Sequence, residues 1–199
     1  LVPDLDGDGE PELAISAPGA STGRVELVST KDGSLLRVLA PLAHTLRYTP
    51  LRFGSALAAA TKRTPEGTWQ VLAVGDPACD GGRGAVVMCT LGAQPVYHGL
   101  GGHEPGEALG ARLFSDDLDG DGGADLLTAG VGGRETAARV ARIDVDSGER
   151  RWTFVASSPA ASHHELQLAP CGDLDGDGVR EVLFTYVPED NPKRGELHV

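Results

Sequence analysis

The sequence has no long apolar run and no cluster of basic residues, and each absence excludes a class of protein. No stretch of about 18 consecutive apolar residues is present, so we expect no membrane span. The chain has 17 Lys and Arg against 29 Asp and Glu, which gives a net charge of −12. Because phosphate contacts need clustered Lys and Arg, we expect no nucleic-acid partner.

Motifs that carry catalysis are also missing. There is no Gly-x-Ser-x-Gly turn for a serine nucleophile and no Gly-rich loop ending in Lys-Ser or Lys-Thr for a phosphate. His98 and His103 lie in a Gly-rich stretch, which we interpret as a connection between structural units and not as a metal site. We therefore expect that the chain is not an enzyme.

Cysteine is scarce, with three residues in 199. Cys79 and Cys89 flank a Gly-Gly-Arg-Gly turn, so both a hairpin disulfide and two free thiols are open alternatives. Cys171 is expected to act as a small packing residue. The cysteines therefore do not decide the redox compartment.

A nine-residue acidic loop, D-x-D-G-D-G-x-x-[D/E], occurs three times, beginning at Asp4, Asp117 and Asp173. Carboxylates at positions 1, 3, 5 and 9 repel one another unless a cation joins them, and a shell of six to eight oxygens suits Ca²⁺. Glycines at positions 4 and 6 allow the backbone to curl, so that the side chains converge. The position-7 carbonyl is the expected backbone ligand. The sequence thus predicts three Ca²⁺ per chain, with these ligands: Asp4, Asp6, Asp8, Glu10, Glu12, Asp117, Asp119, Asp121, Gly123, Asp125, Asp173, Asp175, Asp177, Val179 and Glu181.

Each acidic loop runs directly into a short apolar stretch, which is typical of a buried strand and not of the helix that follows an EF-hand loop. The loops at Asp117 and Asp173 start 56 residues apart, and those at Asp4 and Asp117 start 113 apart, close to two such periods. The missing copy falls near residues 61–67, where Lys62 and Arg63 replace the acids, so we expect no calcium there.

A repeat of this length with four short strands favours a β-propeller. We predict an all-β fold of four-stranded antiparallel blades, about three and a half of them, in one partial propeller domain over residues 1–199. The expected units are 1–45, 46–101, 102–157 and 158–199.

The chain resembles the FG-GAP repeats of integrin α-subunit propellers and their bacterial relatives. The resemblance rests on Phe53-Gly54, on the three acidic loops, and on Ser16-Ala-Pro18 with Gly75-Asp-Pro77 as a variant. Leu109-Gly110 replaces Phe-Gly in the third unit, and Glu165-Leu166 stands there in the fourth. The resemblance implies a parent propeller of seven blades, with ligand recognition on the rim opposite the calcium loops.

Two functions follow as expectations. The first is a calcium-binding module for adhesion or for binding a protein or glycan, outside the cell or on its surface (in a bacterium, also the periplasm), because simple calcium loops suit millimolar Ca²⁺. The second is the propeller part of a secreted lyase-like or phospholipase-like enzyme acting on glycans or glycolipids, with catalytic residues elsewhere. Counting strand directions predicts a partner site near Tyr48, Arg52, Tyr97 and His103. Open blade edges also favour self-association.

Overall fold

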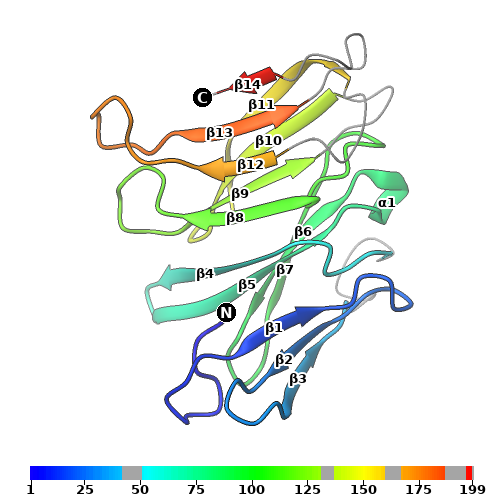
Figure 1. Ribbon diagram of the computed structural model, residues 1–199, viewed down its shortest axis with the longest axis vertical. Coiled ribbons are helices and arrows are strands. Elements are labelled where there is room, and N and C mark those ends of the chain that lie inside the picture. The colour runs from blue at the N-terminus through cyan, green and yellow to red at the C-terminus, as the bar shows by residue number, and fades with distance from the viewer. Residues whose placement is uncertain (42–50, 131–136, 160–166, 187–195, 199) are drawn as a thin grey trace.

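The computed structural model describes residues 1–41, 51–130, 137–159, 167–186 and 196–198. Its strands form four antiparallel sheets, and each sheet uses strands that are consecutive in the chain. We call these sheets blades 1 to 4. They follow one another from the bottom to the top of Figure 1.

Blades 1 and 4 have three described strands each, and blades 2 and 3 have four. Blade 1 comprises β1 (Leu13–Ser16), β2 (Val25–Val28) and β3 (Leu35–Leu39). Blade 2 comprises β4 (Leu57–Thr64), β5 (Gly67–Asp76), β6 (Ala85–Thr90) and β7 (Tyr97–Gly101). Blade 3 comprises β8 (Arg112–Asp116), β9 (Asp125–Gly130), β10 (Ala137–Asp144) and β11 (Arg150–Pro159). Blade 4 comprises β12 (Gln167–Pro170), β13 (Val182–Tyr186) and β14 (Glu196–His198). The prediction of all-β, four-stranded propeller blades is confirmed, while the number of blades in a complete propeller stays a prediction.

The core lies between the blades, and blades 2 and 3 each pack their two faces against different neighbours. Side chains alternate across a strand, and in β5 this alternation divides one apolar run between two clusters. Leu72 and Val74 pack toward blade 1 with Leu27, whereas Val71 and Ala73 pack toward blade 3 with other residues. A strand buried on both faces needs an uninterrupted apolar sequence, which is what Val71-Leu-Ala-Val-Gly75 supplies.

The blades are joined where each one begins. Phe53 pairs with Gly23 of blade 1, and Leu109 makes the equivalent parallel bridge to Gly84 of blade 2. Both side chains are fully buried. Leu109-Gly110 is therefore the third unit's counterpart of Phe53-Gly54. The fourth-unit residues Glu165 and Leu166 lie outside the described part of the chain.

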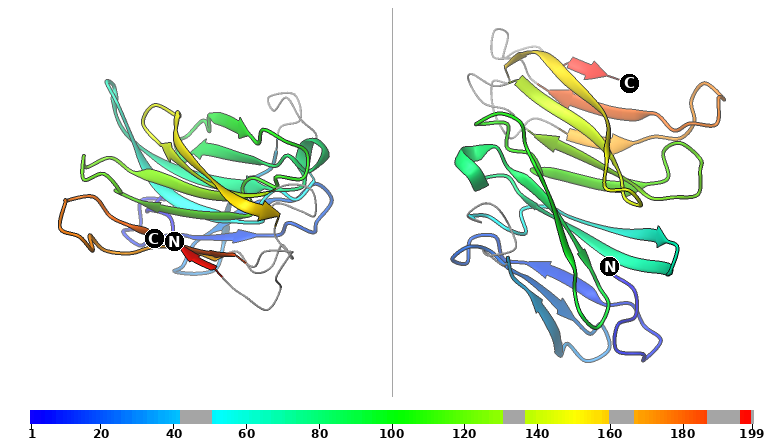
Figure 2. Two further views of the ribbon diagram at one scale, coloured as in Figure 1. Left: turned by 90° about the horizontal axis from the view of Figure 1, so that it is seen from above. Right: turned by 180° about the vertical axis from the view of Figure 1, so that it is seen from behind.

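Connections between the strands divide into two rims. The first, which we call the acidic rim, carries the three acidic loops and the β4–β5 hairpin, and the opposite far rim carries α1 (Cys79–Gly82) and the 102–111 link. Figure 2, right, shows the same division from behind. The inner strands β4 and β12 both lie against β8, so the leading strands of blades 2, 3 and 4 are neighbours.

The structure corrects two expectations and decides between the two alternatives for the cysteines. Residues around His98 form β7 and not a connection, so Tyr97 begins a strand at the acidic rim instead of lying on the far rim. One helix, α1, occurs among the described residues although none was expected, and it is only four residues long. Cys79, Cys89 and Cys171 are free thiols, so there is no Cys79–Cys89 disulfide. Within the described residues, no helix has the length and apolar character needed to cross a membrane.

Candidate metal centres

The three acidic loops share one hydrogen-bond frame. In each, the position-1 carboxylate accepts from the backbone N–H of position 6, and the position-9 carboxylate accepts from the N–H of position 2. The first of these bonds measures 2.9 Å for Gly9 to Asp4, 3.0 Å for Gly122 to Asp117 and 2.9 Å for Gly178 to Asp173. The second joins Leu5 to Glu12, Leu118 to Asp125 and Leu174 to Glu181. The same nine-residue sequence thus forms the same pair of hydrogen bonds in all three loops.

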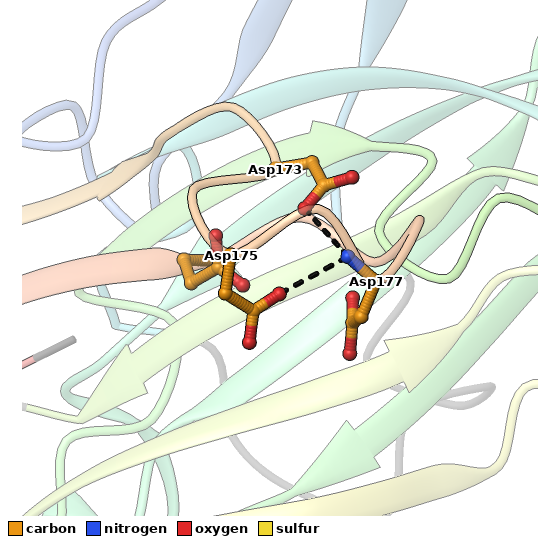
Figure 3. A group of neighbouring side chains, drawn as sticks. Asp173, Asp175 and Asp177 are labelled. Atoms are coloured by element: carbon orange, nitrogen blue, oxygen red, sulfur yellow. Dashed lines mark hydrogen bonds between the residues drawn. The ribbon is translucent and has the colours of Figure 1, made fainter.

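Positions 3 and 5 complete this frame. Figure 3 shows Asp173 and Asp175 both accepting from the N–H of Asp177, at 3.1 Å each. Asp177 in turn accepts from the N–H of Val179 at 2.7 Å. The position-5 acid binds position 7 in the same way in the other two loops, at Glu10 and Gly123. At positions 3 and 5 of the first and last loops, one carboxylate oxygen shapes the loop and no backbone N–H of the described residues binds the second, whereas Asp4 and Asp173 accept backbone N–H groups at both oxygens.

Glycine is required at positions 4 and 6 by backbone conformation, and lack of space adds to this only at Gly120, where a Cβ would lie 3.1 Å from the Gly178 carbonyl oxygen. All six of these glycines have φ between 72° and 91°, the left-handed region that other residues rarely adopt. At Gly7, Gly9, Gly176 and Gly178 a side chain would meet nothing within 4 Å. These residues reverse the chain twice within the loop and bring alternate carboxylates to one side.

The carboxylates converge to different extents in the three loops. Ligand oxygens lie within 4.8 Å of one another for all four acids of the last loop, Asp173, Asp175, Asp177 and Glu181. In the first loop the close group is Asp4, Asp6 and Asp8, while Glu12 is buried and holds the backbone. In the middle loop it is Asp117, Asp119 and Asp125, without Asp121.

The middle loop also differs because arginines contact its acids. Arg63 of the β4–β5 hairpin lies 3.2 Å from Asp121 through Nη2 and Oδ1. Arg142 of β10 pairs with Asp119, and its Nε lies 2.8 Å from Oδ1 of Asp125. Neither contact has a signal in the local sequence, because the partners come from other strands.

The hairpin of blade 2 has no acidic loop, in keeping with its sequence. Its last β4 residues point their charges at blade 3: Lys62 Nζ donates to the carbonyls of Val145 and Asp146 at 3.0 and 2.7 Å. Arg63 Nε donates to Asp146 at 2.6 Å. This part of the rim carries its own cations.

A cation fits the middle loop on a separate observation. Oδ1 of Asp117 is buried and has no hydrogen-bond partner, although Oδ2 accepts from Gly122. A buried carboxylate oxygen without a partner is costly. It is also an oxygen of the kind that Ca²⁺ binds. The donor set here and in the other two loops therefore suits a hard divalent cation.

The local environment shifts the pKa of several candidate ligands. The N–H groups of Gly9 and Gly7 lower the pKa of Asp4, and Arg142 lowers the pKa of Asp119. Burial raises the pKa of Asp125, and Arg142 opposes that shift. Asp4 and Asp119 are therefore ionised at neutral pH, as metal ligands must be.

The residues expected at a partner site are not all together. Arg52 and His103 are exposed on the far rim. Tyr97 lies at the other end of its blade and is partly buried against the blade 1–blade 2 core. Tyr48 lies outside the described residues.

The four antiparallel sheets and their repeated rim loops define a β-propeller repeat protein. Residues 1–28, which span the first acidic loop, β1 and β2, match the family model of the FG-GAP repeat. This match to the first repeat supports the resemblance to the FG-GAP family that the motifs indicate. No curated protein matches the chain.

Proposed function

We propose that this chain is a calcium-stabilised propeller module that binds a protein or glycan outside the cell. The observation that carries the calcium assignment is the shared frame of the three loops, which leaves carboxylate oxygens converging within 4.8 Å in each. Ca²⁺ accepts such irregular shells of oxygen, whereas Mg²⁺ demands a near-ideal octahedron. All fifteen ligands named from the sequence remain in the proposal, including the carbonyls of Glu10, Gly123 and Val179.

Calcium acts on stability in this proposal and takes no part in chemistry. Two like charges 4 Å apart cost about 4 kcal/mol at an effective dielectric of about 20, as an upper-end value. A dication relieves this repulsion in the folded loop alone. Because it binds the folded state, each site adds about 2.7 kcal/mol to the free energy of unfolding when free Ca²⁺ is a hundredfold above its Kd.

The test is a titration of the metal-stripped protein by calorimetry, with melting curves in Ca²⁺, in Mg²⁺ and in excess chelator. We expect about three Ca²⁺ per chain and a melting temperature that falls on chelation. Asp175→Asn should remove one site. Asp80→Asn is the matched control, because Asp80 lies on the far rim with φ of 49°, which Asn tolerates. An unchanged melting curve in chelator, or no bound calcium, would disprove the proposal.

The partner site is proposed on the far rim, because longer loops on a rigid scaffold commonly carry binding. Arg52 and His103 are exposed there: the Arg52 N–H donates to Asp76 at the end of β5, and His103 belongs to the 102–111 link, which contacts α1 through Ala108 and Gly82. Arg52→Ala with His103→Ala should weaken binding to a glycan array or an extracellular-matrix protein panel and leave calcium stoichiometry unchanged. Loss of binding on Asp175→Asn alone, with the fold intact, would place the partner on the acidic rim instead.

A further inference from the structure

The three loops are alike in backbone and different in how their charge is compensated. In the last loop, no ion pair within the described residues engages Asp173, Asp175, Asp177 or Glu181. In the first loop the ion pair is Lys31 with Asp8, at 3.5 Å, and the lysine side chain is 64% exposed. In the middle loop, two guanidinium groups contact three of the four acids.

These two arginines are held in place by more than the loop. Arg63 also donates to Asp146 through its Nε at 2.6 Å and to the carbonyl of Asp121 through Nη1 at 3.1 Å. Lys62 beside it is anchored on the Val145 and Asp146 carbonyls. Arg142 stands on β10, with a side chain that is only 13% exposed. Both charges are therefore fixed at the loop by the surrounding blades.

We propose that Arg63 and Arg142 serve as built-in counter-cations of the 117–125 loop, making it the weakest of the three calcium sites. This inference rests on the proposed function, in which all three loops bind calcium. The blade 2 hairpin lacks acids of its own and contributes a positive charge to the acidic loop of its neighbour.

Competition for the same oxygens is the physical reason. Calcium needs oxygens from Asp119 and Asp121, and these carboxylates already bind guanidinium groups. Asp121, which contacts Arg63, is also the acid missing from the close group of this loop. Calcium still gains the unpartnered Oδ1 of Asp117, so the site is weakened and not abolished.

The arrangement links calcium to the contact between two blades. Arg63 belongs to blade 2, whereas Asp121 and Asp146 belong to blade 3. Calcium entering the middle loop exchanges part of this contact for metal ligation. Without calcium, the arginines compensate the negative charge of the middle loop, whereas the first loop has only the exposed Lys31 and the last loop has no ion pair within the described residues.

Titration of the metal-stripped protein with Ca²⁺ tests the inference. We expect two classes of site, with one site weaker than the other two. Asp117→Asn should remove the weaker class, and Asp173→Asn should remove one of the tighter sites. Arg63→Met should tighten the weaker class by about fivefold, the change that an exposed ion pair of about 1 kcal/mol corresponds to.

Arg83→Met is the matched control, because Arg83 is 40% exposed, close to the 42% of Arg63, and pairs with Asp80 away from the loops. It should leave every calcium affinity unchanged. In excess chelator, Arg63→Met should lower the melting temperature more than Arg83→Met does.

Three equal sites in the wild type, or an unchanged weaker class in Arg63→Met, would overturn this inference and leave the proposed function standing. No calcium at any loop would overturn the proposed function. In that case a melting temperature in chelator that is equal for the two arginine variants would also overturn the counter-cation role.

Discussion

Gly110 shows how a single residue sets the distance between two blades. It has φ of 86°, and a Cβ on it would lie 2.3 Å from the Ala85 carbonyl oxygen and 3.0 Å from the Gly75 Cα. Both neighbours are backbone atoms of blade 2, so they cannot turn aside as a side chain would. The glycine of the Phe-Gly motif is therefore required both by its left-handed backbone conformation and by the lack of room for a side chain.

Gly110→Ala should destabilise the protein more than Gly33→Ala. Gly33 has φ of 76° but nothing within 4 Å of a Cβ, so its replacement bears only the cost of the left-handed backbone, roughly 1–2 kcal/mol. Gly110 adds the cost of displacing packed atoms, roughly 1–3 kcal/mol. Urea denaturation at fixed Ca²⁺ measures both variants. Equal losses in the free energy of unfolding for the two variants would mean that blade 3 can shift away from blade 2 without cost.

At the scale of elements, the β10–β11 hairpin is held by a carboxylate at its start. Asp144 accepts from the backbone N–H of Ser147 at 2.7 Å, and Arg151 donates to it at 2.7 Å. Burial opposes the charged form, but the Ser147 and Arg151 contacts outweigh it and lower the pKa of Asp144 to about 2. The ionised group therefore stabilises the folded hairpin.

Asp144 predicts part of the acid sensitivity of the protein. A carboxyl group whose pKa is lowered by folding stabilises the protein above its unfolded pKa, about 3.9. That contribution is lost as the pH falls through the folded value of about 2. Asp144→Asn should lower the free energy of unfolding at pH 7, and its difference from the wild type should vanish near pH 2. Urea titrations from pH 2 to 7 in chelator measure this, and a difference independent of pH would contradict it.

Local sequence patterns predicted most of the strands. They did not predict features that depend on contacts between distant parts of the chain. The strand after each acidic loop was predictable, because apolar residues follow a loop of fixed chemistry. Tyr97–Gly101 was missed because glycines weaken a strand pattern, and β7 pairs only with β6 among the described strands. Cys79 and Cys89 looked like hairpin partners, but Cys89 lies well along β6 while Cys79 lies in α1 on the far rim.

The candidate ligand acids and their loop conformation were likewise predictable, since nine consecutive residues carry the whole hydrogen-bond frame. Their arginine partners were not, because Arg63 and Asp121 are separated by 58 residues and meet only when two blades pack. That Lys62 and Arg63 disfavour a cation in their own hairpin stays a prediction. Their effect on the loop of the next blade needed the three-dimensional arrangement.

At the scale of the whole molecule, blade 1 presents an apolar outer face. Leu13 and Ile15 of β1 lie on the same side as Leu35 and Val38 of β3, because each pair is joined through one residue of β2. All four are between 41% and 56% exposed. An exposed group of apolar side chains of this kind favours association.

We expect the chain to self-associate through this face as its concentration rises. Ile15→Lys with Leu35→Lys should shift sedimentation profiles toward the monomer. Val96→Lys, at an exposed turn of blade 2, is the control and should not change them. Identical profiles for the double variant and the wild type would assign any association to another surface.

The sheets use consecutive strands, and the described bridges between sheets join only successive ones. Such a molecule resembles a linear array, in which each unit has an intrinsic stability and an interface energy with its neighbours. Duplicating one period of 56 residues would then insert a blade between two existing ones without altering their internal pairing. A protein built in this way can change in size by whole repeats, so its number of blades is free to vary during evolution while its acidic loops are copied intact.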